Sequence, residues 1–423
     1  MTRNQKKLLF VSSLGGVLEF YDFIIYALFA SYLSEAFFPT VHPLVSLMIT
    51  FATFAIGYVV RPLGGIIFGH FGDRLGRKSM FVLSILLMAI ATLGIGCIPS
   101  YNQIGLSAPI LVLACRILQG LSIGGEIPGA ITYVSESIPE QRGLACGIIF
   151  CALTLGIVIG SVMHAVIVST LTNDQIHTYG FRLPFIIGGI MGLFSYKLRL
   201  KLKESAQFQA IESHLEKFPV LTVIKEQGRN TLSGMLITAL CAAIITALFL
   251  FIPSYFTQIL NLPATSYIWE RTGAVALGSF LAIPFGFLSD KLNLKKMILI
   301  LCCLVILLAY PIFVIYAYFP KYYLIALGLS SLLMGMSAGI IPSFLSTLFP
   351  TSIRFSGIAV SYNLGFALFG GFTPFISFSL IYYTGINTAS AFYLLIVAVL
   401  TGLSLILVKP PAKITSGERV ISC

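Results

Sequence analysis

Charged side chains are scarce in this chain. Asp, Glu, Lys and Arg make up 10% of its 423 residues and 57% are hydrophobic, whereas a water-soluble domain carries about 25% charged residues. So few charges cannot cover a water-soluble surface of this size, which leaves lipid as the surrounding solvent. The alternation of apolar and polar residues that marks membrane β-strands, over about 10 residues at a time, is missing as well. Unbroken apolar runs such as 297–318 instead predict spanning helices, whose backbone groups bond within the segment.

Motifs for nucleotide or metal chemistry are also absent. No Gly-x-x-x-x-Gly-Lys-Ser/Thr loop is present to cradle phosphates, so an ATP-driven pump is not expected. The eight cysteines fall mostly in apolar runs without a metal-ligand spacing, and we read them as small apolar packing residues. We therefore expect neither an enzyme nor a cofactor.

The apolar runs divide the chain into twelve segments, each long enough for the roughly 17–25 residues of a membrane crossing. They lie near 8–36, 46–70, 79–99, 105–134, 143–170, 180–200, 231–260, 266–288, 296–317, 322–349, 355–382 and 387–408. The long polar interruption at 201–230 separates six segments from six. The expected fold is an all-α polytopic membrane protein with an N-terminal bundle (1–200), a linker (201–230), a C-terminal bundle (231–410) and a tail (411–423).

Lysine and arginine are distributed unequally between the loops, which predicts the orientation. The net charge of +11 is therefore explained by topology, and no nucleic-acid partner is expected. Both termini are predicted to be cytoplasmic, in the inner membrane of a bacterium. The inner loops hold Arg3, Lys6, Lys7, Arg74, Arg77, Lys78, Arg142, Lys291, Lys295, Lys296, Arg354, Lys409, Lys413 and Arg419, against Arg182, Arg271 and Lys321 outside.

The two halves repeat the same landmarks. Asp73 follows the second segment and Asp290 the eighth, while Arg142 follows the fourth and Arg354 the tenth. The two spacings are nearly equal. This recurrence predicts an internal repeat of six helices and therefore a pseudo-symmetric pair of bundles.

Several motifs resemble the major facilitator superfamily. They are Gly69-x-x-x-Asp73-Arg74-x-Gly76-Arg77-Lys78, Gly16-Val-Leu-Glu19-Phe-Tyr-Asp22, Arg61-Pro-Leu-Gly-Gly65, Arg116-Ile-Leu-Gln119-Gly120 with Gly124-Gly125-Glu126, and Arg354-Phe-Ser-Gly357 with Tyr362-Asn363. The first resembles the family's signature loop. The others are similar to its metabolite:proton symporter branch, whose members carry proline and betaine, 2-oxoglutarate, citrate or shikimate.

The resemblance implies a secondary transporter with its substrate site near the midplane, coupled to protons and working by alternating access. We expect import of a small carboxylate-bearing or zwitterionic metabolite by a monomer in the lipid bilayer. The alternatives are an exporter of hydrophobic compounds or siderophores on the same fold, and a membrane sensor that does not transport. The chain lacks the long C-terminal coiled coil of osmosensing members, which argues against osmotic gating.

Charged residues inside the predicted spans are candidates for function, because a charge at the bilayer centre costs about 2.5–3.5 kcal/mol on insertion scales. Glu19, Asp22 and Tyr26 share one helical face near the middle of the first segment. Burial and mutual repulsion disfavour two ionised carboxylates at once, so Glu19 and Asp22 are predicted to carry the proton. Alternatively, one or both bind Arg116 and hold helices together.

Arg116 lies at similar depth in the fourth segment and needs an anion. Asp22 or Glu19 is its expected partner in the empty site and a substrate carboxylate in the occupied one, a permanent ion pair being the alternative. Glu126 lies about 15 Å further along the helix, nearly on the face of Gln119, and cannot reach Arg116. We predict substrate contact for Tyr26 and Gln119, and for Glu126 either proton acceptance or helix packing.

Neutral polar residues are predicted to line the C-terminal side of the substrate site. The candidates are Tyr255 and Gln258 in the seventh segment and Tyr362 and Asn363 in the eleventh. Glu270 and Arg271 begin the eighth segment and are expected to reach the outer interface by snorkelling.

The repeated loops are candidates for a cytoplasmic gate. In the superfamily, the Asp of the signature loop meets the start of the eleventh segment, which here is near residues 355–357. A carboxylate at a helix N-terminus gains about 0.3–1 kcal/mol from the dipole, so Asp73 is expected to close the gate there and Asp290 to do the same near Gly143. The predicted gate comprises Asp73, Arg74, Gly76, Arg77, Arg142, Asp290 and Arg354.

Overall fold

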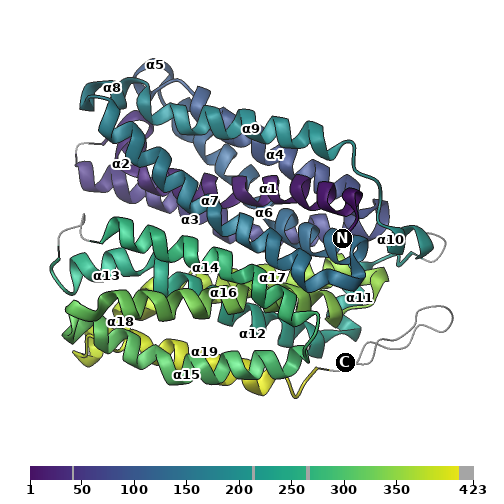
Figure 1. Cartoon of the computed structure of the whole chain (residues 1–423). Helices are drawn as coiled ribbons and strands as arrows, with labels where there is room; N and C mark the ends of the chain where they lie inside the picture. Colours follow the sequence, from purple (N-terminus) through teal and green to yellow (C-terminus); the bar gives the residue numbers. More distant parts are fainter. Residues whose placement is uncertain (41, 212–214, 263–266, 409–423) are drawn as a thin grey trace.

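The computed structural model describes residues 1–40, 42–211, 215–262 and 267–408, and helices dominate it (Figure 1). The N-terminal half contains α1 (Arg3–Leu28), α2 (Ala30–Phe37), α3 (Pro43–Leu75), α4 (Arg77–Cys97), α5 (Tyr101–Ile104), α6 (Ser107–Ser137), α7 (Arg142–Thr170), α8 (Asn173–Thr178) and α9 (Leu183–Arg199). The linker contains α10 (Ala206–Ile211) and α11 (Pro219–Glu226). The C-terminal half contains α12 (Gly228–Ile245), α13 (Ile252–Gln258), α14 (Ile268–Ser289), α15 (Leu294–Tyr318), α16 (Tyr323–Leu348), α17 (Arg354–Gly365), α18 (Thr373–Thr384) and α19 (Ser390–Ser404).

The expected all-helical membrane fold is confirmed in the described residues. Eleven helical stretches have the length and hydropathy of a membrane span, and the twelfth apolar helix, α19, is shorter with 15 residues. The first predicted segment is two helices, because the backbone leaves helical geometry at Phe29 (φ −96°, ψ 12°) between α1 and α2. The cations predicted at 409, 413 and 419 and the tail 411–423 lie outside the described residues.

Two of the spans are interrupted by π-helical turns. Thr246–Leu250 separates α12 from α13, and Phe366–Gly370 separates α17 from α18. A π turn inserts a residue into the helical ladder and is frequent at functional sites. Both turns lie in the C-terminal half.

The two halves lie side by side along their length, with α10 and α11 at the end that also holds the N-terminus (Figure 1). Helix α3 packs on α17 and α7 on α14 across the boundary. The second contact is close because glycines face each other: a Cβ on Gly286 would lie 2.4 Å from the carbonyl oxygen of Gly143. Another glycine, Gly76 (φ 106°), makes the tight turn from α3 to α4.

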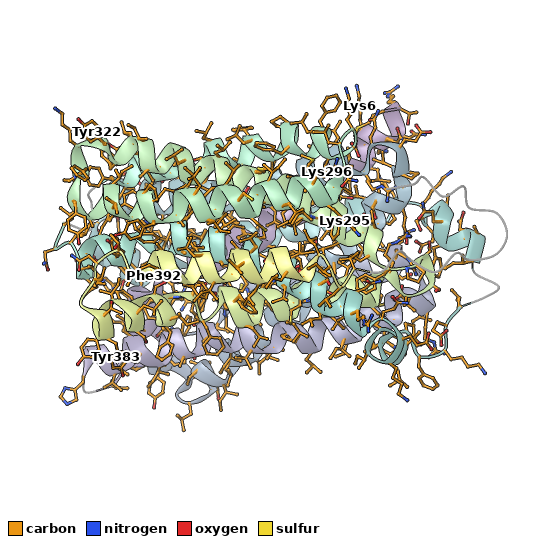
Figure 2. All side chains as sticks on the ribbon, turned by 90° about the horizontal axis from the view of Figure 1, so that it is seen from below. Lys6, Lys295, Lys296, Tyr322, Tyr383 and Phe392 are labelled. Carbon is orange, nitrogen blue, oxygen red and sulfur yellow. The ribbon has the colours of Figure 1, made fainter. Side chains whose placement is uncertain are left out.

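Side chains of different character mark the two ends of the molecule. Figure 2 shows Lys6, Lys295 and Lys296 toward one end and Tyr322 and Tyr383 at the other. The lysine end is the one that carries the linker helices. Between the ends, large apolar side chains on outer helix faces are exposed, as the surface of a protein in lipid requires.

Candidate functional site

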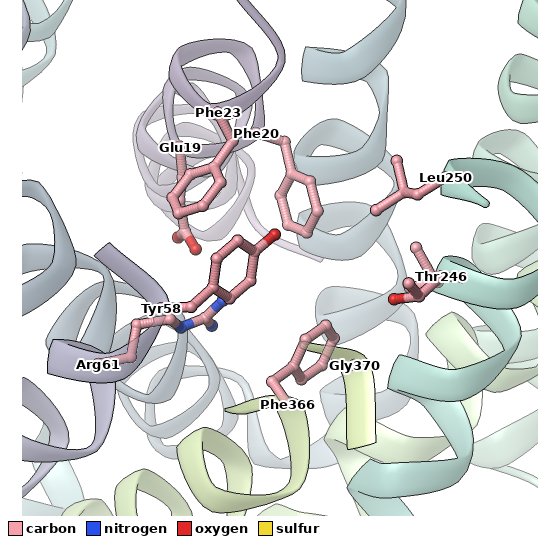
Figure 3. Close-up of a pocket in the computed structure, with 10 residues that line it drawn as sticks. Glu19, Phe20, Phe23, Tyr58, Arg61, Thr246, Leu250, Phe366 and Gly370 are labelled. Atoms are coloured by element: carbon pink, nitrogen blue, oxygen red, sulfur yellow. The ribbon is translucent and has the colours of Figure 1, made fainter. Parts of the chain in front are cut away.

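A small cavity lies between the two halves (Figure 3). Its volume is about 20 Å³, which is room for about one water molecule. Both π turns contribute to its wall, so the breaks in the C-terminal spans shape the site. The lining residues are Glu19, Phe20, Phe23, Tyr58, Arg61, Ile245, Thr246, Leu250, Phe366 and Gly370.

Glu19 and Arg61 are the charged residues of this wall, and both are almost fully buried, with 2% and 3% of their surface exposed. The Glu19 carboxylate points toward Tyr58 and Arg61 (Figure 3). Glu19 Oε2 and Arg61 Nη2 have no hydrogen-bond partner among the described residues. Buried charged groups with unused hydrogen-bonding atoms are costly unless a further group satisfies them.

Arg61 is held in place from the C-terminal half. Its Nε donates to Asn363 Oδ1 at 3.4 Å, and its guanidinium lies 5.3 Å from the centre of the Phe366 ring. Asn363 Nδ2 in turn donates to the carbonyl oxygen of Gly124 at 2.8 Å. The Tyr362 ring stacks on Phe366 at 4.7 Å, with its hydroxyl near Arg61 but without hydrogen-bond geometry. Asn363 and Tyr362 therefore contact residues of the cavity wall, and their substrate-binding role stays a prediction.

A second charged cluster lies inside the N-terminal half. Asp22 Oδ2 and Arg116 Nη1 are 3.7 Å apart, and Asp22 Oδ1 accepts a 2.7 Å hydrogen bond from Thr92. Arg116 also donates to Gln119 Oε1 at 2.7 Å, and Gln119 donates to Thr92 at 3.1 Å. Arg116 Nε and Nη2 have no hydrogen-bond partner among the described residues.

Aromatic rings enclose Arg116 and separate it from the cavity. Its guanidinium carbon lies 4.3 Å from the Tyr26 ring centre, 5.0 Å from Phe54 and 5.1 Å from Phe23. Phe23 also lines the central cavity. One aromatic side chain therefore touches both charged clusters.

The structure divides the carboxylates that the sequence grouped together. Asp22 is the partner of Arg116, whereas Glu19 faces Arg61. Arg61 was not among the residues selected from the sequence, although it is an arginine in the middle of a predicted span. The insertion-cost argument used for Arg116 applies equally to Arg61 and would have found it.

Glu126 forms a buried ion pair with Arg199. Arg199 Nη1 donates to Glu126 Oε2 and to the carbonyl oxygen of Phe81, both at 2.8 Å, and Nη2 donates to Glu126 Oε1. Ser84 adds a 2.7 Å hydrogen bond to the carboxylate. Of the two roles left open for Glu126, this geometry favours helix packing. Arg199 was overlooked because it lies at the end of the sixth predicted segment.

Two predicted residues of the C-terminal half lie away from the cavity. The Tyr255 hydroxyl donates to the carbonyl oxygen of Asn387 at 3.0 Å and its ring packs on Phe313, while Gln258 is exposed. Glu270 is exposed and accepts a 3.1 Å hydrogen bond from Tyr323. We therefore do not include Tyr255 and Gln258 in the proposed site.

At the linker end, each half places a carboxylate on a helix of the other. Asp73 accepts hydrogen bonds from the backbone N–H groups of Phe355 (3.2 Å) and Ser356 (2.8 Å), at the start of α17. Asp290 accepts from Gly143 (2.7 Å) and Leu144 (2.9 Å), at the start of α7. These are the contacts expected from the sequence, and they draw this end of the two halves together.

A buried charge network reinforces the same end. Glu136 accepts a 3.2 Å hydrogen bond from Arg77 and a 3.1 Å hydrogen bond from Arg354 of the opposite half. Arg77 also pairs with Asp73 at 3.1 Å and donates to the carbonyl oxygen of Thr351. Of the other predicted gate residues, Arg74 is exposed and Arg142 is half-buried, near enough to Asp290 to interact electrostatically.

The linker completes this network. Ser205 donates to Glu136 at 2.7 Å, Arg354 donates to Gln207 at 2.7 Å, and the guanidinium of Arg77 lies 4.5 Å from the Phe208 ring centre. Glu204 accepts from the backbone N–H of Lys78 at 3.1 Å, and burial raises the pKa of its carboxyl. Sequence reasoning missed these contacts because it treated 201–230 as a solvated connection.

Two Gly-x-Ser-x-Gly sequences occur, around Ser122 and Ser337, and neither forms a hydrolase site. Both serines lie inside long helices, α6 and α16, instead of at a strand-to-helix turn. Their hydroxyls donate to the carbonyl oxygens of Ser84 (2.6 Å) and Met334 (2.8 Å). These residues serve helix packing.

Comparison with known proteins gives consistent matches. The Major Facilitator Superfamily profile matches residues 12–354. A putative proline/betaine transporter of Staphylococcus aureus (strain COL) is 35% identical, over 94% of this chain and 87% of the relative. The citrate-proton symporter of Klebsiella pneumoniae is 32% identical (92% and 88%), and the shikimate transporter of Escherichia coli (strain K12) is 31% identical (93% and 92%). Among solved structures, the proton:xylose symporter XylE bound to 6-bromo-6-deoxy-D-glucose is 18% identical, covers 94% of both chains and has a TM-score of 0.77.

Proposed function

Because this chain belongs to the major facilitator superfamily of membrane transporters, we propose that it is a proton-coupled symporter for a small carboxylate-bearing solute. The solutes named for the relatives, proline, betaine, citrate and shikimate, all carry a carboxylate. We further propose that a zwitterion with a cationic nitrogen, such as an amino acid or a betaine, fits the central site best. The chain is a multi-pass membrane protein, and we place it in a bacterial inner membrane as a monomer with both termini cytoplasmic.

The observation that carries this proposal is the buried pair of Glu19 and Arg61 with unused hydrogen-bonding atoms at an aromatic cavity between the halves. A guanidinium suits the planar, two-point recognition of a carboxylate. Aromatic faces and an anion suit a cationic nitrogen. Arg61 would therefore bind the carboxylate of the solute, while Glu19 and the rings of Phe23, Tyr58 and Phe366 surround its cationic end.

The structure represents a state that is closed around a space too small for such a solute. Room has to come from the movement of aromatic side chains and from the separation of the two halves. The hydrogen bonds that join the halves in the described residues lie at the linker end or at the level of Asn363, so separation begins most easily from the opposite end. Solute would enter from that side, which we assign to the exterior.

We assign the proton to Asp22. A proton on this carboxylate removes its attraction to Arg116, and Arg116 then gains freedom to move against Phe23, which also borders the solute. Coupling requires that proton and solute each bind the two states of the protein with different affinity. Phe23 supplies the physical connection between the two clusters.

The test is uptake into proteoliposomes of purified protein under an imposed pH gradient, acidic outside. We screen radiolabelled proline, glycine betaine, citrate and shikimate, with a protonophore as control. We expect accumulation of a zwitterion that collapses with the protonophore. Accumulation of citrate or shikimate alone would reject the zwitterion assignment, and gradient-driven loss of solute from preloaded vesicles would reject import.

A further inference from the structure

The linker helix α11 has an apolar face that no other part of the described protein covers. In α11, Pro219 and Val223 are buried where the helix packs on α3, α12 and α17. On the other side, Phe218, Leu221 and Ile224 are 60%, 46% and 57% exposed. Their spacing of three residues puts them on one face of the helix, so α11 has two apolar faces and only one is occupied.

Helix α11 packs on α3, a spanning helix that carries its own exposed apolar stripe. Ile67, Phe71 and Leu75, spaced four residues apart toward the end of α3, are exposed and form the last part of its outer apolar stripe. Helix α11 packs against α3, and Figure 1 places it at the end of the molecule that holds the linker. Helix α11 is therefore packed beside a spanning helix whose outer apolar stripe faces acyl chains.

The charges around this face are predominantly positive. Lys217, Lys225 and Arg229 are exposed on or beside α11, and Arg74 is exposed on the last turn of α3. The acidic residues nearby are Glu226, which is exposed, and Glu216, which is half-buried. Lys225, four residues after Leu221, lies on the apolar side of the helix itself, where its alkyl stem can carry the ammonium group to the surface. An apolar face accompanied by basic residues is typical of a helix that lies in the membrane surface and attracts anionic headgroups.

We propose that α11 is an interfacial helix that rests in the headgroup layer of the cytoplasmic leaflet, with anionic phospholipid as its partner. The assignment to the cytoplasmic side rests on the proposed topology. The contact with lipid rests only on the apolar and basic residues that α11 exposes. Phe218, Leu221 and Ile224 insert among the upper parts of the acyl chains. Lys217, Lys225 and Arg229 remain at the level of the phosphates.

The test uses full-length protein in vesicles and tryptophan fluorescence. The single tryptophan is removed by Trp269→Phe, and a reporter is introduced by Leu221→Trp. Matched controls are Leu63→Trp, on the exposed lipid side of α3, and Gln209→Trp, on the exposed side of α10. Lipids brominated near the top of the acyl chain quench a tryptophan that lies in the membrane, and iodide quenches a tryptophan that lies in water.

We expect bromolipid to lower the tryptophan fluorescence of L221W and L63W by about twofold or more and to leave that of Q209W nearly unchanged. Iodide should quench Q209W strongly and the other two variants weakly. Quenching of L221W by iodide and not by bromolipid would place α11 in water and overturn the proposal.

The choice of lipid is tested with vesicles of phosphatidylcholine alone and of equal parts phosphatidylcholine and phosphatidylglycerol. The bromolipid quenching of L221W should be stronger in the mixture, and Lys225→Gln with Arg229→Gln should remove that difference. Equal quenching in both vesicles would overturn the role of anionic lipid. None of these measurements depends on transport, so a failed uptake assay leaves them interpretable.

Discussion

Arg61 and Arg116 are both buried arginines of the N-terminal half, and their surroundings differ. Arg61 borders the cavity and is held by Asn363 of the other half. Arg116 is enclosed by aromatic rings and paired with Asp22. We therefore expect substitutions in the Arg61 cluster to weaken solute binding and substitutions in the Asp22–Arg116 cluster to impair coupling to the proton.

Arg61→Gln should weaken binding of the carboxylate solute by about tenfold or more, because a neutral amide replaces a charge-assisted two-point contact. Since the substitution leaves Glu19 buried beside a neutral group, the double variant Arg61→Gln with Glu19→Gln is measured as well. Equilibrium binding at fixed pH is the readout, and the exposed Arg229→Gln is the control. Wild-type affinity in both Arg61 variants would remove this residue from the solute site.

Asp22→Asn should abolish accumulation driven by a pH gradient while leaving solute counterflow, because the amide cannot take up or release the proton. The comparison is Asp174→Asn, an exposed carboxylate on α8. Uptake of the labelled solute with and without the gradient separates the two activities. If D22N still concentrates solute as the wild type does, the proton is carried elsewhere.

At this scale, the sequence located the charges in the spans and offered Asp22 as a partner of Arg116, which the structure confirms, but it did not separate Glu19 from that pair. Glu19 and Asp22 are three residues apart, so their side chains leave the helix about 60° apart. That angle is small enough to suggest one site and large enough for each carboxylate to meet a different arginine. Which arginine each meets depends on how α3, α4 and α6 pack around α1, and a single helix does not encode that packing.

Among the elements, the spanning helices could be predicted directly from the apolar runs. The contacts of the linker and the positions of the helix breaks could not. The two π turns depend on local packing at the cavity, and no residue type marks them. The linker was predicted to be a connection, yet Ser205, Gln207 and Phe208 bind the gate network. Their polar character is equally compatible with a solvated loop, so the contact could not be read from composition.

Glu136→Gln should open the predicted gate at the linker end, because it removes the carboxylate that buried Arg77 and half-buried Arg354 share. Arg77 keeps its ion pair with Asp73, so the loss should be smaller than the roughly 3–5 kcal/mol expected when a buried charge loses its only partner. Labelling of Cys146 by a thiol reagent, followed by mass spectrometry, reports the opening, since Cys146 is buried on α7 near Asp290. We expect faster labelling in E136Q. The exposed Glu140→Gln, four residues away, should behave as the wild type; equal rates in the two variants would show that the network does not hold the gate.

In the whole molecule, the gate contacts are repeated by the internal symmetry, and the sequence revealed this because Asp73 and Asp290 recur at matching positions. The closure of the central site could not be predicted from the repeat. It depends on how far the two halves have approached, which is a property of one conformation and not of the sequence pattern.

The gate should respond to pH through Asp290, which lies outside the spans. Burial raises the pKa of this carboxyl above its usual range, despite the two backbone N–H groups and the nearby Arg142. The Asp290 carboxyl therefore binds a proton more tightly in the closed contact than it does when it is exposed. Lowering the pH through this raised pKa favours the closed state, and raising it favours opening.

Labelling of Cys146, corrected for the intrinsic pH dependence of an exposed thiol, should therefore slow as the pH falls toward the ordinary carboxyl range near about 4. This dependence should be reduced in Asp290→Asn, which cannot titrate. An unchanged pH profile in D290N would assign the response to another group.

The donors that Asp73 and Asp290 engage belong to the main chain of α17 and α7. Every amino acid except proline supplies such a donor, so exchanges at Leu144, Phe355 or Ser356 leave the docking atoms in place. The docking therefore depends on the side chain of one aspartate per half and on the glycines that permit close approach, and not on the side-chain identity of the receiving helix ends.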